Sequence, residues 1–514
     1  MEATLLIAQK PPPVVRPAKQ GETPPSTGWW STAFGIDTRS LGAFRIGLAI
    51  LLLCDLAIRC TDIPAHYSDW GLLPRTPLVD HLLGNLPFVS IHLISGSSYV
   101  IAALFAVAAF FALCLLVGYK SKISTIISWF MLSSLHTRNP MILQGGDVLL
   151  RMLLFWGMFL PLDAAFVPGR LDSKRAILSM ATAALLLQVC CVYFFGALLK
   201  TDPAWTVQHS AVYNALSIEQ FSTPLGRWLL AFPALLRLFT VTTRWMELIG
   251  PCLAVLPLPL FLPWARQRIA IVLAFVGFHI SMGLCLHLGL FSAICSVAWI
   301  PFLPGEFWDR IAPFTGRAGL FLARLPLPSV GYTPSPVSAA HRAVIRRLAN
   351  AAALVFLVYV IHWNIRTVNP RIDLPMLHRL DWMAQLFRLD QTWDMFAPAP
   401  LREDGWYVVP GLLADGSMAD IRRDGPVDWQ KPAIVSANYK NDRWRKYMVN
   451  LAAQQHTWYR APYAEYLRRK WNEEHPASQR LVSVWIYYMM VLTRPDGGKD
   501  KPVPILLWQY KWDT

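Results

Sequence analysis

A single lysine ends a long apolar segment of this chain. Lys200 directly follows the run ALLLQVCCVYFFGALL, and Trp205 comes five positions later. A lysine at the end of a membrane helix has two ordinary roles. Its flexible stem can carry the ammonium to headgroup water as an anchor, or loss of water can favour the neutral amine, which is able to act as a base.

Other ionisable residues lie within or beside apolar segments. Asp147 and Arg151 belong to QGGDVLLRMLLFW, Glu247 belongs to RWMELIGP, and His279 and His287 belong to VGFHISMGLCLHLGLF. Such residues are costly inside a bilayer and usually mark a functional site. Several of them in one chain favour a buried polar cavity over independent exceptions.

Three of the ionisable residues are predicted to share one cavity that opens to the extracytoplasmic side. Lys200 ends one predicted helix, Glu247 lies in the next, and His279 lies in the one after that. The alternative interpretation makes Lys200 an anchor, Glu247 a partner of Arg244 and His279 a hydrogen-bonded core residue. Lys200 is the best single candidate for a catalytic base.

Asp147 and Arg151 are one helical turn apart, a spacing at which opposite charges pair. Gly145 and Gly146 precede them and would let backbones approach closely. We predict a structural role for this motif, with Asp147 available to pair with Arg151.

The composition defines the class of protein. Hydrophobic residues make up 54% of the 514 residues, charged residues only 15%, and there are 22 tryptophans. We predict a polytopic α-helical membrane protein with a bilayer as its partner. Several apolar segments are shorter than the roughly 20 residues of a perpendicular span, so we predict eight or nine transmembrane helices at 41–58, 99–117, 123–135, 148–162, 177–199, 238–260, 269–286, 291–303 and 344–361.

Basic residues gather in alternate loops, and the positive-inside rule places those loops in the cytoplasm. We therefore expect a multi-pass membrane protein with a cytoplasmic N-terminus. The predicted organisation is a disordered Pro-rich cytoplasmic tail at 1–36, a transmembrane domain at 37–304, a cytoplasmic loop at 305–343, a last transmembrane helix at 344–362 and an extracytoplasmic α+β domain at 381–514.

The C-terminal segment carries strand and helix patterns. WYVVPGLLADGSMADI alternates around Asp415 and Gly416, which predicts a hairpin. LVSVWIYYMMVLT and PILLWQYKW predict two further strands because they are rich in aromatic and β-branched residues. Apolar residues at helical spacing over 444–471 predict a helix that is interrupted near Pro462.

Several function classes are excluded. The net charge of +15 is carried largely by the basic loops, so we predict no nucleic-acid partner. The eight cysteines lie in or beside apolar segments without CxxC spacing, so we predict neither a metal site nor a secreted disulfide framework. The chain has no phosphate-binding loop, dinucleotide fingerprint, HExxH or GxSxG motif.

Four segments together resemble the bacterial HTTM (horizontally transferred transmembrane domain) family, which is related to vitamin K-dependent gamma-glutamyl carboxylase. They are RSLGAFRIGLAILLLCDLAIRCTDIPAHYSDWGLLPR, HTRNPMILQGGDVLLRMLLFWGMFLPL, YFFGALLKTDPAW and LDQTWDMFAPAPLREDGWYVVPG. The resemblance covers roughly 38–303 and resumes from residue 393.

The resemblance implies a reaction. A membrane lysine followed five residues later by tryptophan would deprotonate a vitamin K-like hydroquinone, and Lys200 and Trp205 match that pattern. His279 matches a second functional position. The quinol would react with oxygen to give a strong base that removes a glutamate γ-proton before carbon dioxide adds, and a water-poor cavity would protect that base.

One position departs from the family pattern. The carboxylases have an Asn-His pair where this chain has Asn139 and Pro140, and proline offers neither a proton nor a donor. Quinol oxygenation could survive this change while transfer to a glutamate is lost. Three hypotheses therefore stand: a quinol-dependent oxygenase or carboxylase, a non-enzymatic maturation or export partner of a secreted peptide, and a structural membrane protein with paired buried charges.

Overall fold

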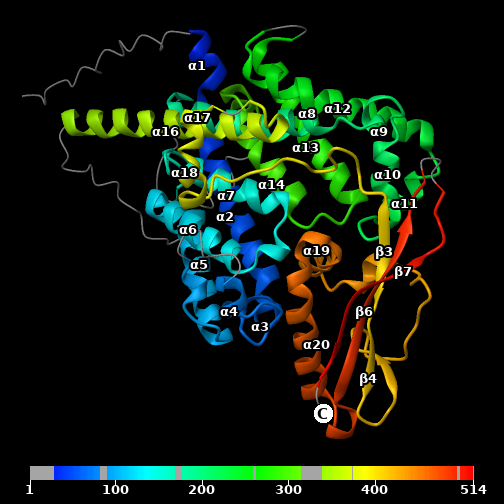
Figure 1. Cartoon of the computed structure of the whole chain (residues 1–514). Coiled ribbons are helices and arrows are strands. Elements are labelled where there is room, and N and C mark those ends of the chain that lie inside the picture. Colours follow the sequence, from blue (N-terminus) through cyan, green and yellow to red (C-terminus); the bar gives the residue numbers. More distant parts are fainter. Residues whose placement is uncertain are drawn as a thin grey trace, which may run out of the picture.

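The computed structural model describes residues 28–80, 90–167, 176–258, 262–313, 339–372, 374–494 and 498–512. Most of the predicted tail at 1–36 and most of the predicted loop at 305–343 lie outside these residues. Figure 1 shows a group of helices from the first three quarters of the chain joined to a C-terminal unit of helices and long strands.

Within the described ranges, five helices are long and apolar enough to cross a membrane. The membrane-protein class follows from them, whereas the predicted number of eight or nine spans is not confirmed. The five helices are α2 (Thr38–Cys60), α5 (Ser98–Val117), α8 (Met180–Leu199), α13 (Trp264–Cys285) and α16 (Ala339–Val368).

The other four predicted spans form helices that are shorter or less apolar than these five. They are α6 (Ser121–Arg138), α7 (Gly145–Gly157), α12 (Pro233–Val255) and α14 (Phe291–Ala298). The 13 residues of α7 and the 8 residues of α14 are fewer than the roughly 20 that a span requires. Serine and threonine interrupt the apolar run of α6, while Arg237, Arg244 and Glu247 interrupt that of α12.

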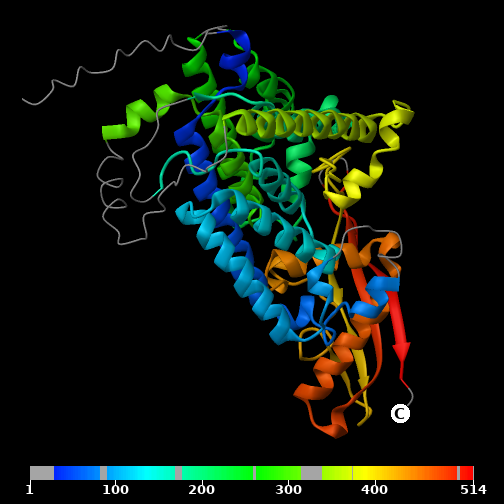
Figure 2. The ribbon, with the colours of Figure 1, turned by 90° about the vertical axis from the view of Figure 1, so that its left-hand side faces the viewer.

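The helices pack into two connected layers. One contains α2, α5, α6, α7 and α14, each in contact with the next in that order, and the other contains α8 between α12 and α16. One continuous apolar core joins the two layers through α7 and α8, including the fully buried Trp156 and Trp299. In both views α16 runs across the direction of α2 (Figures 1 and 2).

The C-terminal unit is built on an antiparallel sheet with β6 (Leu481–Leu492) at its centre. One edge of β6 pairs with β7 (Val503–Lys511), and the other pairs with β3 (Glu403–Val408) and β4 (Pro410–Leu413). The predicted hairpin is confirmed because β4 pairs with β5 (Met418–Asp420). Gly416 supplies the positive φ of 83° that its turn requires.

Two helices cover this sheet, namely α19 (Asp442–Ala452) and α20 (Arg460–Glu474). The predicted helix over 444–471 is therefore interrupted, but the break lies at 453–459 and not at Pro462. Pro462 sits in the first turn of α20, where its missing N–H removes no helical hydrogen bond.

The segment before the sheet packs with the membrane helices. Met383 and Ala384 of α18 (Asp381–Leu386), together with Leu389 and Trp393, are buried in the same apolar core as α7 and α8. A second core joins the C-terminal unit to the loop after α2, with Tyr67 among the tyrosines of α19 and α20. The sheet begins only at Glu403, so the C-terminal unit is fused to the helices through two cores.

Short elements complete the described fold. They are α1 (Trp29–Phe34), β1 (Ile36–Asp37), α3 (Ile63–Tyr67), α4 (Arg75–Leu78), β2 (Ala176–Ile177), α9 (Pro203–Thr206), α10 (Ala211–Ser217), α11 (Pro224–Leu229) and α17 (Pro375–His378), with short 3-10 turns at Ile91–Leu93, Pro140–Ile142, Ile300–Phe302, Val435–Asn438, Gln454–Tyr459 and Ala477–Gln479.

Candidate active site

A cavity of about 1790 Å³ lies between the membrane helices and the C-terminal unit. Its walls come from α8, α12 and α13 on one side and from α19, β6 and β7 on the other. Lys200, Glu247 and His279 all line it. The cavity therefore contains the three side chains that the sequence places on adjacent helices.

Lys200 and Glu247 form a buried ion pair. The Lys200 Nζ donates to Glu247 Oε2, and the two residues are 4% and 8% exposed. Lys200 is the C-cap residue of α8, while Glu247 lies within α12, which packs along α8. The alternative pairing of Glu247 with Arg244 is not what the structure has, and Lys200 is not an exposed anchor.

Trp205 covers the ammonium of Lys200. Its ring centroid lies 5.1 Å from Lys200 Nζ, a distance at which a cation is attracted to the ring face. The short helix α9 positions this ring, because the Asp202 side chain caps its N-terminus and Pro203 begins it. The Trp205 indole also donates to the Phe396 carbonyl at 2.9 Å, which ties α9 to the segment before the sheet.

His279 is held by an aromatic group on the cavity wall. Its Nε2 lies 2.7 Å from the Tyr193 hydroxyl, which also accepts a hydrogen bond of 3.0 Å from the Trp299 indole. His279 is 1% exposed, and its Nδ1 has no hydrogen-bond partner among the described residues. Tyr193 also lines the cavity, so a phenol and an imidazole are available there for proton exchange.

Asn139 and His287 do not line the cavity. The buried Asn139 donates to the His66 carbonyl at 3.0 Å and accepts from the Met141 N–H at 3.2 Å, so its amide organises the turn before α7. His287 follows α13 with an exposed side chain, and its backbone pairs with Phe221. His287 therefore lies just beyond the apolar helix, which ends at Cys285.

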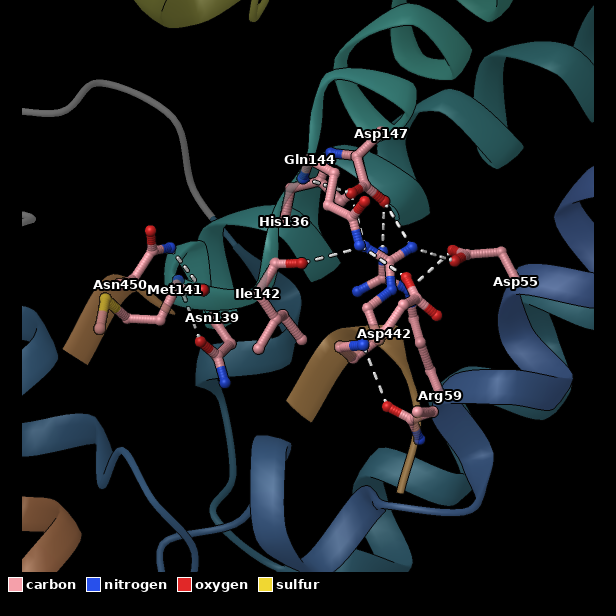
Figure 3. A network of polar contacts seen from close by, with 12 residues as sticks. Asp55, Arg59, His136, Asn139, Met141, Ile142, Gln144, Asp147, Asp442 and Asn450 are labelled. Atoms are coloured by element: carbon pink, nitrogen blue, oxygen red, sulfur yellow. Dashed lines mark hydrogen bonds and ion pairs between the residues drawn. The ribbon is translucent and has the colours of Figure 1, made fainter. Parts of the chain in front are cut away.

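Asp147 belongs to a charge cluster that connects the C-terminal unit to the membrane helices (Figure 3). We define the interdomain charge cluster as Asp55, Arg59, Asp147 and Arg443. Arg59 bonds Asp55 at 2.7 Å and Asp147 at 2.6 Å. Arg443, from α19, bonds Asp55 at 2.7 Å and Asp147 at 2.5 and 2.8 Å. Two carboxylates and two guanidiniums thus neutralise one another in a buried site.

The surroundings of Asp147 keep its carboxylate charged. Burial alone would raise its pKa, but Arg443 and Arg59 together hold that pKa well below its usual range. Asp147 also accepts from the Gln144 N–H at 2.7 Å, as part of a capping box at the start of α7.

The predicted pairing of Asp147 with Arg151 is wrong. Arg151 instead bonds Asp390, at 2.6 Å to the carbonyl and 3.2 Å to the carboxylate. The reason is that both arginine partners of Asp147 come from other elements and reach it with better geometry than a neighbour one turn away on the same helix.

Sequence reasoning missed Tyr193 and Arg443. Tyr193 lies inside the apolar run before Lys200, about two helical turns from it, and a polar aromatic in such a run is the signal that could have found it. Arg443 carries no such signal, since its partners lie 296 and 388 residues away in the chain.

Comparison with protein-family models, with curated proteins and with solved structures found no match to this chain. Among the described residues, no group of three or more His, Cys, Asp or Glu side chains is placed to hold a metal ion.

Proposed function

We propose that this chain is a membrane oxidoreductase of the HTTM type that deprotonates a quinol at Lys200 and lets it react with dioxygen. One observation carries the proposal: a buried lysine, paired with a carboxylate and covered by a tryptophan, lies on a large and mostly apolar cavity. A lysine that served only as an anchor would reach solvent instead.

The pair allows Lys200 to become a neutral amine, which is the form of lysine that can act as a base. When Glu247 holds the proton that the pair shares, the neutral Lys200 amine can take a second proton from a quinol hydroxyl. The resulting ammonium is stabilised by the Trp205 ring and by a hydrogen bond to the protonated Glu247 carboxyl group, which regains its charge once it releases its proton. The quinolate that forms gives electrons to dioxygen more readily than the quinol does. Apolar residues such as Phe278 and Met246 line the same cavity and suit a quinone ring and tail.

Oxygen uptake by the purified protein tests this proposal. A panel of reduced quinones, including vitamin K-like naphthoquinols, is added to wild type, to Lys200→Met and to Lys470→Met, a control at an exposed lysine of α20. We expect uptake above the quinol-only rate for wild type and the control, and loss of about 100-fold or more for Lys200→Met, the scale of acid–base catalysis. Equal rates for wild type and Lys200→Met would refute the proposal.

A second candidate is a maturation or export partner of a secreted peptide. It is favoured by the size of the cavity, which exceeds the roughly 300–1,000 Å³ of an ordinary small-molecule site, and by the C-terminal unit that forms one wall. Wild type without uptake on any quinol, together with a peptide that co-purifies with it, would place this candidate first.

A further inference from the structure

Two cations of α19 face the cavity and have no carboxylate within ion-pair distance among the described residues. Arg445 and Lys446 both line the cavity, and neither forms an ion pair with a carboxylate in the described part of the chain. Arg445 is 3% exposed. Its guanidinium stacks 4.0 Å from the Phe221 ring and donates to the His287 carbonyl at 3.1 Å, while its Nε has no partner.

The acidic residues of the cavity do not neutralise these cations. Glu247 is paired with Lys200, and Asp390 is paired with Arg151. Asp394 and Glu403 have exposed side chains, although Asp394 attracts Lys446, and Asp442 attracts Arg445, from beyond ion-pair distance. The wall formed by α19 is therefore a positive, partly dehydrated surface.

Burial at the cavity wall disfavours the charged forms of Arg445 and Lys446. Burial lowers the pKa of Arg445 to about 10. Burial, and then the neighbouring Arg445, lower the pKa of Lys446 from its ordinary value. A bound anion would reverse both effects, because an opposite charge favours the ionised form of each side chain.

Part of the opposite wall of the cavity is apolar and comes from α12 and α13. Phe239 of α12 and Met282 of α13 line this part, apart from the Lys200–Glu247 pair. A ligand that satisfies both walls has an anionic head and a hydrocarbon body. An acidic peptide would match α19 but would leave the apolar wall without a complementary surface.

We propose that the cavity holds an anionic phospholipid, with its phosphate at Arg445 and Lys446 and its acyl chains along α12 and α13. Charge complementarity and the amphipathic lining select this occupant over zwitterionic lipids. The cavity volume of about 1790 Å³ leaves room for a second molecule near Lys200. The proposal is independent of the base role of Lys200.

Lipid binding to the full-length protein in detergent tests this site. Phosphatidylglycerol and phosphatidylcholine are titrated separately into delipidated wild type, Arg445→Gln/Lys446→Gln and the charge-matched control Arg468→Gln/Lys470→Gln on the exposed face of α20. Bound lipid is measured by native mass spectrometry. We expect wild type and the control to prefer phosphatidylglycerol, and the α19 variant to bind it about 10- to 100-fold more weakly, since a charge-assisted hydrogen bond contributes about 1.5–3 kcal/mol.

Competition measurements and further variants in the same experiment distinguish the lipid from other ligands. Inorganic phosphate should compete only weakly, whereas stronger displacement by phosphate or by a glutamate-rich peptide than by lipid would overturn the lipid assignment. Equal affinity for both lipids would also overturn it. Lys446→Met, which leaves the contacts of Arg445 in place, replaces the double variant if that variant unfolds. Lys200→Met should bind phosphatidylglycerol like wild type, so failure of the proposed reaction and failure of this site can be told apart.

Discussion

At the scale of single residues, the chemistry of the cavity rests on the Lys200–Glu247 pair. The sequence placed these residues on neighbouring helices but offered no reason to pair them, because their contact depends on how α12 lies along α8. Burial of both partners makes each the counter-ion of the other. Removing one partner strands a charge, whereas removing both does not.

Single and double substitutions of the pair can therefore distinguish an effect on stability from an effect on activity. Glu247→Gln should lower thermal stability and reduce quinol-dependent oxygen uptake, because the ammonium loses its carboxylate. Replacing both residues with apolar ones, Lys200→Met/Glu247→Leu, should restore stability but not oxygen uptake. Thermal unfolding and oxygen uptake measured on the same preparations check both expectations. Activity that returned with stability in the double variant would make the pair purely structural.

A second residue-scale prediction concerns Asp147. Asp147→Asn leaves Arg59 and Arg443 short of one carboxylate and should destabilise the protein by about 3–5 kcal/mol. Thermal unfolding compared with Asp415→Asn, a change in an exposed turn, measures the effect. A variant as stable as the control would mean that Asp55 alone satisfies both arginines.

Because the pKa of Asp147 is lowered, the stability that the interdomain charge cluster contributes depends on pH. A carboxyl group whose pKa is lower in the folded state stabilises the fold above its ordinary pKa of 3.8, and the contribution is lost as the pH falls below that value. Wild type should therefore show a stability decrease below about pH 4 that is smaller in Asp147→Asn. Acid unfolding followed by tryptophan fluorescence checks this, and identical acid profiles would contradict it.

At the scale of secondary-structure elements, local sequence patterns predicted the strands of the C-terminal unit, because burial of one face of a strand restricts its residues. The alternation in WYVVPGLLADGSMADI predicted the hairpin, and the aromatic and β-branched residues of LVSVWIYYMMVLT predicted the strand that lies at the centre of the sheet. Pro462 predicts the break between α19 and α20 in the wrong place, because the first turn of a helix accepts a proline. The contacts of Arg443 with α2 and α7 join distant parts of the chain, and no spacing rule anticipates them.

Helix α19 carries the main polar attachment of the C-terminal unit. Arg443→Met should leave Asp55 and Asp147 with one arginine between them and loosen this attachment. We expect faster proteolysis at the connecting segment 397–402, measured by gel after limited trypsin digestion in detergent. Arg468→Met on α20 is the control. Equal cleavage rates in the two variants would show that the two apolar cores and the remaining polar contacts hold the unit without Arg443.

At the scale of the whole molecule, composition predicted the membrane class, whereas the predicted number of spans is not confirmed. Apolar stretches such as 148–162 and 291–303 form short helices within the helical core, and a buried helix and a bilayer span have the same apolar composition. The sequence predicted that Lys200, Glu247 and His279 share a cavity, but not that α19, β6 and β7 of the C-terminal unit form its other wall.

The topology remains a prediction with a direct check. With nine of the predicted eight or nine spans, or with the five candidate spans among the described residues, the number is odd and the two ends of the chain should lie on opposite sides. Reporter fusions to the N-terminal tail and after Thr514 should report the cytoplasm and the extracytoplasmic side, respectively. The same compartment for both would imply an even number of spans and move the cavity wall formed by α19 to the cytoplasmic side.

The central claim is that the Lys200 amine acts as a base in this cavity, and amine rescue tests it most directly. Lys200→Ala removes the side chain and leaves space for a small alkylamine, while Trp205 and Glu247 remain. We predict that this variant consumes oxygen with quinol only when ethylamine is added, with a rate that rises with the concentration of free base and saturates. An unchanged rate at every ethylamine concentration in a folded variant, or full activity without ethylamine, would contradict the claim.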